Sequence, residues 1–453
     1  MFQKFRHTFY RYICSVLIIF MLTACASTST TSNPVPASEE KITFTICVTP
    51  MTDDIFYQTL HIKLKQLFPD VSFEFVTVPD DSESDPQVME AEEAALTKLR
   101  TEIMSGRGPD LFVLDASNLR LIQDPDKQMR AGVFADLAPY LDTIAAEATL
   151  NETVLAAGRV GEAQYLLPLY YTVPGVAVPA EALAGFNAGD PPSPAAFLEK
   201  LLAHCGAEGF APLGGLIGSA DSLAYAPALD YEARAAALNE DQLALAALLA
   251  DTEAWTRATG FQVWRPARGV PSAEIPFDAC VMGFNYLERQ ALGLLDQEID
   301  PIVLPIPNGN GGATASVELY AGVRANSPHI QLAAEMLARL LRPEALKQMD
   351  GTTYPYTYSV NEDAVQELTE NFCRAYRTER QKLGEDIPYT VADCDALAQQ
   401  FTEAVRAVNT ARFTNMSDNA LRRLVIGPVA RGEATLEEAA ADFAAEYRFY
   451  FDE

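Results

Sequence analysis

Short β-branched segments alternate with amphipathic helical segments early in the chain, and this alternation limits the folds open to it. Residues 42–49 and 71–78 have the composition and period of strands, and residues 53–68 between them have helical apolar spacing. A further apolar run, residues 111–114, follows a second helical segment. Such alternation predicts an α/β fold with parallel strands, right-handed crossovers and ligands at the carboxyl ends of the strands.

A sharp turn is predicted immediately before the apolar run 111–114. Gly106 and Gly108 allow the chain to leave a helix and reverse, and Pro109 fixes φ between them and the strand. Asp110 can accept a backbone N–H bond in this turn. We therefore expect the turn to serve the fold, and the end of the following strand to present functional side chains.

The N-terminus has the pattern of a bacterial export signal. Basic residues precede an apolar stretch at residues 13–22, which is too short to cross the roughly 30 Å hydrocarbon layer as a helix. The tetrapeptide Leu22-Thr23-Ala24-Cys25 resembles the lipobox of exported lipoproteins. This resemblance implies that residues 1–24 are a signal peptide and that Cys25 is lipidated, which anchors the protein to a membrane. The alternative is an ordinary signal peptide cut nearby, with Cys25 an incidental thiol.

Residues 25–40 are rich in Ser, Thr and Pro and lack apolar periodicity, which predicts a flexible linker. The roughly 410 residues that follow exceed what one hydrophobic core usually organises. We therefore expect two lobes behind a tether.

Charge and cysteine usage exclude several classes of protein. The chain has 33 Lys and Arg against 62 Asp and Glu, a net charge of −29, and it shows no basic stripe that would bind nucleic acid. Its seven cysteines have no CxxC spacing, which argues against a disulfide scaffold and a zinc site. A bridge between Cys373 and Cys394 remains open. No metal and no cofactor are predicted.

Six segments in a fixed order identify a family resemblance. They are the tetrapeptide ending at Cys25 and residues 105–110, 132–140, 279–284, 320–341 and 432–439. In this order they resemble an extracellular solute-binding lipoprotein of a bacterial ABC importer, from the large family that includes carbohydrate receptors. Each segment is weakly specific alone, and the set covers most of the mature chain.

The resemblance implies the class II periplasmic-binding-protein-like fold, in which each of two lobes is a mostly parallel sheet flanked by helices. Strands at residues 165–173 and 316–324 are expected to cross between the lobes as a hinge. The implied N-terminal lobe comprises residues 41–168 and 321–350, and the C-terminal lobe comprises residues 169–320 and 351–453.

Ten residues are candidates for solute binding on this basis: Asp115, Ser117, Asn118, Tyr170, Tyr171, Trp264, Asn285, Tyr286, Tyr320 and Tyr354. The first three follow a buried strand, where the family places a ligand loop. The aromatic residues are candidates because sugar C–H faces stack on rings, while sugar hydroxyls need polar partners. The alternative for a tyrosine pair in a strand is that one ring is core and the other surface.

The implied function is a monomeric receptor on the outer face of the cytoplasmic membrane, which captures a sugar or oligosaccharide by hinge closure and delivers it to a permease. Three alternatives remain: a secreted carbohydrate hydrolase, a receptor for a peptide or polyamine, and a surface scaffold. The sequence contains no HExxH, GxSxG or GxxxxGK[ST] motif, which favours a receptor over an enzyme. Asp115 could pair with a cationic solute as readily as with a hydroxyl.

Overall fold

The computed structural model of the protein describes residues 42–49, 55–79, 86–116, 118–189, 192–207, 209–217, 225–260, 277–282, 287–342 and 357–451. The signal segment, Cys25 and the linker lie outside these residues. Within the described part of the chain, no helix has the length and hydropathy needed to span a bilayer.

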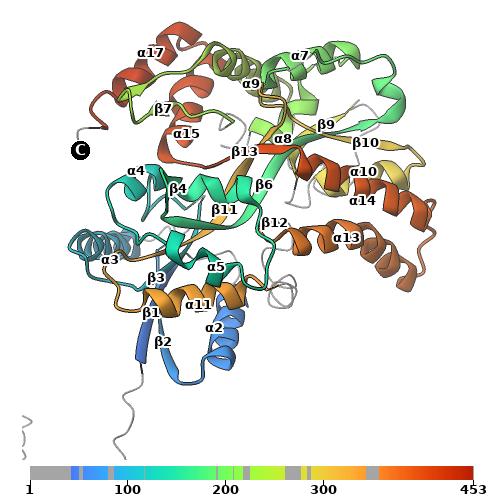
Figure 1. The fold of residues 1–453 in the computed structure, drawn as a ribbon. Helices are drawn as coiled ribbons and strands as arrows, with labels where there is room; N and C mark the ends of the chain where they lie inside the picture. The colour runs from blue at the N-terminus through green and yellow to red at the C-terminus, as the bar shows by residue number, and fades with distance from the viewer. Residues whose placement is uncertain are drawn as a thin grey trace, which may run out of the picture. The chain divides into compact units, whose positions relative to one another are not determined.

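The strands and helices alternate along the chain (Figure 1). The strands are β1 (Ile42–Val48), β2 (Val71–Thr77), β3 (Leu111–Asp115), β4 (Arg159–Val160), β5 (Ala163–Gln164), β6 (Leu166–Pro179), β7 (Leu229–Asp230), β8 (Ala235–Ala236), β9 (Asp278–Met282), β10 (Pro301–Pro305), β11 (Ala313–Val323), β12 (Tyr358–Ser359) and β13 (Val408–Phe413). The helices are α2 (Ile55–Leu67), α3 (Pro86–Met104), α4 (Pro125–Arg130), α5 (Leu141–Ile144), α6 (Glu152–Leu155), α7 (Pro194–His204), α8 (Gly214–Ile217), α9 (Glu240–Thr259), α10 (Leu287–Asp296), α11 (Ile330–Leu340), α13 (Glu362–Lys382), α14 (Val391–Arg406), α15 (Met416–Leu421), α16 (Gly427–Ala430) and α17 (Leu436–Glu446). A π-helical turn, Arg422–Ile426, joins α15 to α16.

The main sheet has the strand order β10-β6-β11-β3-β1-β2, with β9 and β12 also paired to β6 and β13 paired to β11. The pairs β1–β3 and β11–β13 are parallel, as the alternation of strands and helices predicts. The pairs that β6 and β11 form with each other and with β3, β9, β10 and β12 are antiparallel. The α/β class is confirmed, and the sheet is mixed because these two long strands run against their neighbours.

The strand β6 connects two hydrophobic cores, and its long neighbour β11 packs into the first of them. Along β6, Tyr171 and Val173 belong to the first core, whereas Val176 and Val178 belong to the second. The first half of β6 pairs with β11 and β12, and the second half pairs with β9 and β10. Figure 1 shows β6 and β11 passing between the elements around α2, α3 and α11 and those around α7, α9 and α17. This is the crossing predicted for the two strands.

Pro174 does not interrupt β6, although the sequence suggests a break there. The ladder with β11 ends at Thr172, and the ladder with β10 begins at Gly175. Pro174 lies between these two ladders and is the register partner of Val281 on β9, so the strand continues through it although it has no N–H to donate. Its carbonyl still accepts a hydrogen bond from the Ile306 amide at 2.8 Å.

The turn before β3 stabilises the fold, as predicted. Gly106 and Gly108 have φ of 70° and 99°, which glycine adopts without strain. The Asp110 carboxylate accepts hydrogen bonds from the Thr45 amide at 3.1 Å and from the Arg324 guanidinium at 3.2 Å. Asp110 therefore ties β1, β3 and the end of β11 together, which fixes the direction in which β3 delivers its last residues.

Candidate functional site

One face of the crossing strands is polar. Thr172 on β6 is the register partner of Ser316 on β11, and Ser316 is the register partner of Arg412 on β13. Residues directly opposite each other in a sheet point to the same face, so these three side chains lie on one side of the hinge strands. The Ser316 hydroxyl is 3.3 Å from the hydroxyl of Thr414, which follows β13. We call this surface the polar hinge face.

A buried carboxylate lies in the middle of β11. Glu318 has 8% of its surface exposed, and its Oε1 accepts a hydrogen bond from the fully buried Thr172 hydroxyl at 2.8 Å. The backbone carbonyl of Glu318 accepts a hydrogen bond from the Ala116 amide at 2.7 Å. An acidic side chain this deep in a sheet is uncommon in a purely structural strand. Glu318 connects both crossing strands to the segment that follows β3.

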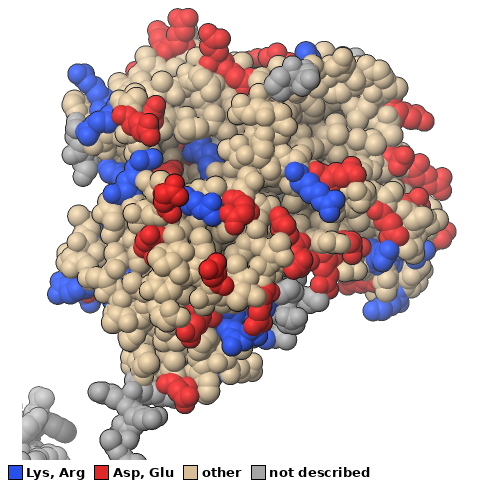
Figure 2. Space-filling model, viewed as in Figure 1, with Lys and Arg blue, Asp and Glu red and all other residues tan. Residues whose placement is uncertain are grey.

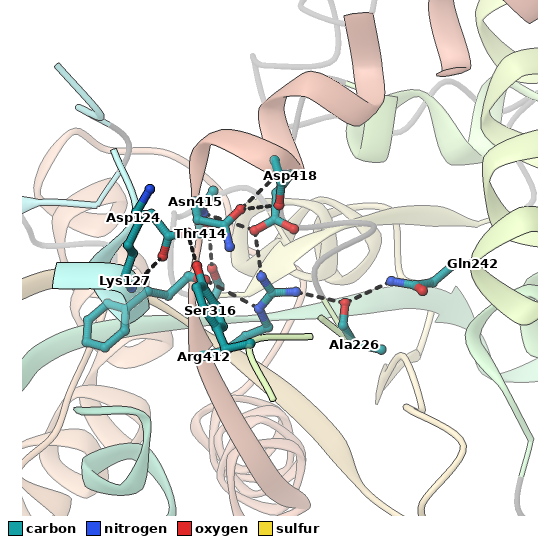
Figure 3. A network of polar contacts seen from close by, with 12 residues as sticks. Asp124, Lys127, Ala226, Gln242, Ser316, Arg412, Thr414, Asn415 and Asp418 are labelled. Atoms are coloured by element: carbon teal, nitrogen blue, oxygen red, sulfur yellow. Dashed lines mark hydrogen bonds and ion pairs between the residues drawn. The ribbon is translucent and has the colours of Figure 1, made fainter. Parts of the chain in front are cut away.

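Arg412 is the centre of a polar network, shown in Figure 3. Its guanidinium donates to the Asp418 carboxylate at 2.7 Å and to the Ala226 carbonyl at 2.8 Å. The Gln242 side chain donates to the same carbonyl at 2.8 Å. The Arg412 and Asp418 side chains have 11% and 0% of their surface exposed, so the ion pair is nearly dry. Such a pair is costly to break, because either partner alone would be left as a buried charge.

The Asp418 carboxylate is positioned by the start of α15. The Asn415 side chain accepts a hydrogen bond from the Asp418 amide at 3.1 Å, and the Asp418 carboxylate accepts one from the Asn415 amide at 2.9 Å. These two reciprocal bonds form a capping box at the start of α15. The same carboxylate thus caps a helix and holds Arg412. This coupling fixes the loop after β13 beside the polar hinge face.

Asp115 and Tyr320 lie beside each other at the end of β3. The Asp115 amide donates to the Thr49 hydroxyl at 2.7 Å, which joins the carboxyl ends of β1 and β3. Tyr320 packs edge-on against Phe413 with ring centroids 5.0 Å apart. Burial raises the pKa of the Tyr320 phenol, and the nearby Asp115 carboxylate raises it further. Asp115 is the register partner of Leu319, and Tyr320 is the register partner of Leu114, so both residues lie near the carboxyl end of β3, where the fold class places ligands.

The helix α4 contacts the C-terminal segment of the chain. Asp124, which is 1% exposed, accepts hydrogen bonds from the hydroxyls of Tyr231 and Tyr450, the latter at 2.8 Å. The Lys127 ammonium donates to the Tyr450 carbonyl at 2.8 Å and lies 4.1 Å from the centroid of its ring. These contacts link α4, whose Met129 belongs to the first core, to residues that pack against the second core.

Asp126, in the first turn of α4, faces a group of charges. Burial and the neighbouring Asp124 carboxylate raise the pKa of Asp126 from 3.8 to about 6. Asp418 raises it as well, whereas Arg412 and Arg130 lower it. A carboxyl group with a pKa near 6 changes its charge close to neutral pH.

Tyr171 points to the opposite side of the sheet from Thr172, because successive strand residues alternate. Its register partners are Val317 and Tyr358, and its ring lies 5.8 Å from the ring of Tyr358. Its buried hydroxyl has no hydrogen-bond partner among the described residues. This side chain borders a cavity of about 520 Å³ between α6, α13 and α14, whose walls include Glu362 and Arg406.

The structure brings some of the predicted site residues together and separates others. Asp115 and Tyr320 lie on the paired strands β3 and β11 near the carboxyl end of β3. Asn118 follows Asp115, and its amide donates to the Asp115 carbonyl at 3.2 Å. Tyr170 and Tyr171 lie on opposite faces of β6. Five predicted residues lie outside the described part of the chain: Ser117, Trp264, Asn285, Tyr286 and Tyr354.

The sequence prediction missed Thr172, Glu318, Arg412 and Asp418. A signal for Glu318 was present, since it is the one charged residue in the apolar segment 313–323. The N-x-x-D pattern from Asn415 to Asp418 was a signal for a helix start. Arg412 had no local signal, because its role depends on partners distant in the sequence.

The acidic side chains are spread over the visible surface rather than gathered at this site (Figure 2). Basic side chains are interspersed among them, and no basic stripe crosses this face. Among the described residues, no group of three or more His, Cys, Asp or Glu side chains has the geometry of a metal site. The polar hinge face carries hydrogen-bond donors and acceptors on strands whose backbones are buried.

Comparisons with known proteins identify the fold. No protein-family model matches the sequence, and no curated protein matches it. Among solved structures, an extracellular solute-binding protein of family 1 from Alicyclobacillus acidocaldarius has a TM-score of 0.56 at 15% identity, covering 93% of this chain and 100% of that one. A cyclic α-maltosyl-1,6-maltose binding protein from Arthrobacter globiformis has a TM-score of 0.52 at 16% identity, with 90% and 99% covered. The GacH receptor of Streptomyces glaucescens has a TM-score of 0.51 at 16% identity, with 91% and 99% covered.

These matches extend over nearly the whole of each relative, and they confirm the architecture that the order of sequence segments implied. The chain therefore has the two-lobed α/β fold of extracellular solute-binding proteins.

Proposed function

We propose that this protein is a receptor that captures a carbohydrate between its two lobes and delivers it to an ABC importer. The observation that carries the proposal is the polar hinge face, which lies on the two strands that cross between the cores. The Thr172 hydroxyl and the Glu318 carboxylate hold each other by a buried hydrogen bond, and the Arg412 guanidinium is held by its ion pair with Asp418. Fixed polar groups of this kind are what a sugar with many hydroxyls requires.

The printed names of the structural relatives favour a sugar over other solutes. The Arthrobacter globiformis protein binds a cyclic maltosyl-maltose, and the GacH receptor was solved with acarbose. We assign the first contacts with the sugar to Asp115, Asn118 and Tyr320 together with the polar hinge face. Tyr170 shares the side of β6 that carries Thr172 and belongs to the same proposed site.

Capture requires no bond to be made or broken. A sugar that contacts both lobes binds the closed arrangement better than the open one, so it shifts the population toward closure. The contacts of α4 with Tyr231 and Tyr450 join residues of the two cores, and we assign them to the closed arrangement.

We further propose that Cys25 carries a lipid and that residues 25–40 tether the receptor to the outer face of the cytoplasmic membrane. The tether raises the effective concentration of the receptor at its permease. Labelling cells with a radioactive fatty acid tests this point, and a Cys25→Ala variant is expected to lose the label and to leave the membrane fraction. Label retained by this variant would overturn the assignment.

Thermal-shift screening of the soluble region from residue 41 onward tests the function itself. Binding to the folded state alone raises stability by RT ln(1 + [L]/Kd), so a cognate sugar at about 100 times its Kd adds about 2.7 kcal/mol. We expect an oligosaccharide to raise the melting temperature and to be recovered unchanged. A shift produced only by peptides or polyamines would contradict the carbohydrate assignment, and hydrolysis of the sugar would indicate an enzyme.

A further inference from the structure

The helices α13 and α14 pack as an antiparallel pair with a well-defined register. Four contacts fix it: the Thr369 and Thr402 hydroxyls at 3.0 Å, the Phe372 and Phe401 ring centroids at 5.3 Å, Arg374 with Asp395 at 2.7 Å, and Arg377 with the Tyr389 carbonyl at 3.1 Å. Residue numbers rise on one helix as they fall along the other. This register therefore determines which residues of α13 face which residues of α14.

Cys373 and Cys394 face each other within this register. Both side chains are fully buried, with 0% of their surface exposed, and the two thiols are close enough for each to affect the pKa of the other. The other described cysteines lie on different elements: Cys47 on β1, Cys205 at the end of α7 and Cys280 on β9. Among the described residues, Cys373 and Cys394 are the cysteines that a defined helix–helix register brings opposite each other.

We propose that Cys373 and Cys394 form a disulfide in the exported protein, which cross-links α13 to α14. The inference rests on the extracellular location that the proposed function requires, because disulfides persist in oxidising compartments. Each thiol loses its proton, one S–S bond forms, and the two electrons pass to the disulfide of an extracytoplasmic thiol–disulfide oxidoreductase, which becomes a dithiol.

The bond must form before the two helices are fully packed. Burial raises the pKa of both thiols, so the reactive thiolate is scarce once the core has closed. In the partly folded chain the sulfurs are accessible, and the short connection between the helices keeps them near each other. After packing, the same burial protects the disulfide from reductants. Closing this loop restricts the unfolded chain and so stabilises the folded one.

Mass spectrometry of the exported full-length protein tests the proposal without any variant. The protein is unfolded in guanidinium chloride and alkylated with N-ethylmaleimide, with or without prior reduction. Of the five described cysteines, we expect three to react without reduction and all five after it. Peptide mapping should recover a cross-linked pair containing Cys373 and Cys394. Alkylation of all five without reduction would overturn the proposal.

Two variants provide a second readout. Oxidised wild-type protein is expected to melt higher than the reduced protein, by on the order of 5 °C. The double variant Cys373→Ser/Cys394→Ser should melt at one temperature with or without reductant, whereas the matched control Cys205→Ser should keep the difference. A difference that persists in the double variant would contradict the assignment. The screen for sugar binding does not depend on this bond, so failure of one proposal is distinguishable from failure of the other.

Discussion

At the scale of single residues, the polar hinge face combines side chains that the sequence shows in isolation. Asp115 was predicted from its place after an apolar run, which is a local signal. The roles of Glu318 and Arg412 depend on partners that are distant in the sequence. Thr172 donates a hydrogen bond to Glu318 over a separation of 146 residues, and Arg412 donates one to the Ala226 carbonyl over a separation of 186. A pattern of apolar and polar residues carries no information on such partners, which explains why both were missed.

Replacing Asp115 with alanine should weaken sugar binding. A hydrogen bond to a charged group contributes about 1.5–3 kcal/mol, so we expect the affinity to fall roughly 10- to 100-fold without loss of fold. Isothermal titration with the sugar identified by thermal shift measures this. The matched control is Asp142→Ala, at an exposed carboxylate of α5 outside the proposed site, which should bind the sugar as the wild type does. Equal affinities for the wild type and Asp115→Ala would remove this residue from the site.

Replacing Asp418 with alanine should be among the most destabilising single changes. It leaves the Arg412 guanidinium buried without its carboxylate, and breaking a buried pair on one side typically costs about 3–5 kcal/mol. Denaturation by guanidinium chloride measures the free energy of unfolding. As a control, Glu446→Ala breaks a pair with Arg423 whose side chains are 56% and 65% exposed, and it should change stability little. Similar values for both variants would show that the Arg412 network is not a major source of stability.

At the scale of elements, the periodicity of apolar residues predicted the short strands and helices well and the long strands less well. The strand at residues 42–49 and the helix at residues 53–68 appear as β1 and α2, because each pattern reflects burial of one face. The Pro174-Gly175 pair suggested a break, whereas β6 continues through it by changing partners. The helix α15 continues through the π-helical turn into α16, so the region from Met416 to Ala430 is helical throughout.

The helix α4 is expected to make stability depend on pH. The folded-state pKa of Asp126, about 6, lies above the usual 3.8 of an aspartate, so the folded protein holds this proton more tightly than the unfolded chain. The contribution to stability is therefore complete below about pH 4 and is lost as pH rises through about 6, with a size of about 3 kcal/mol.

The variant Asp126→Asn should be less sensitive to pH between 4 and 7 than the wild type and more stable than it at pH 7.5. Denaturation at several pH values measures both effects. Asp142→Asn, at an exposed carboxylate in the first turn of α5, serves as the control and should follow the wild type. A wild-type pH profile retained in Asp126→Asn would contradict this account of α4.

At the scale of the whole molecule, two cores share the long strand β6, and β11 pairs with its first half, where Thr172 and Ser316 are register partners. The sequence predicted this arrangement from the order of weak segments rather than from any single motif. The location of the lobe boundaries and the roles of Ser117, Trp264, Asn285, Tyr286 and Tyr354 stay predictions. The proposed receptor should change its dimensions when a solute draws the lobes together.

Small-angle X-ray scattering of the region from residue 41 onward, with and without the sugar that raises its melting temperature, tests the central claim most directly. We predict a smaller radius of gyration with the sugar, and no change with a sugar that leaves the melting temperature unaltered. A radius of gyration that stays the same at saturating sugar would contradict capture by closure of two lobes.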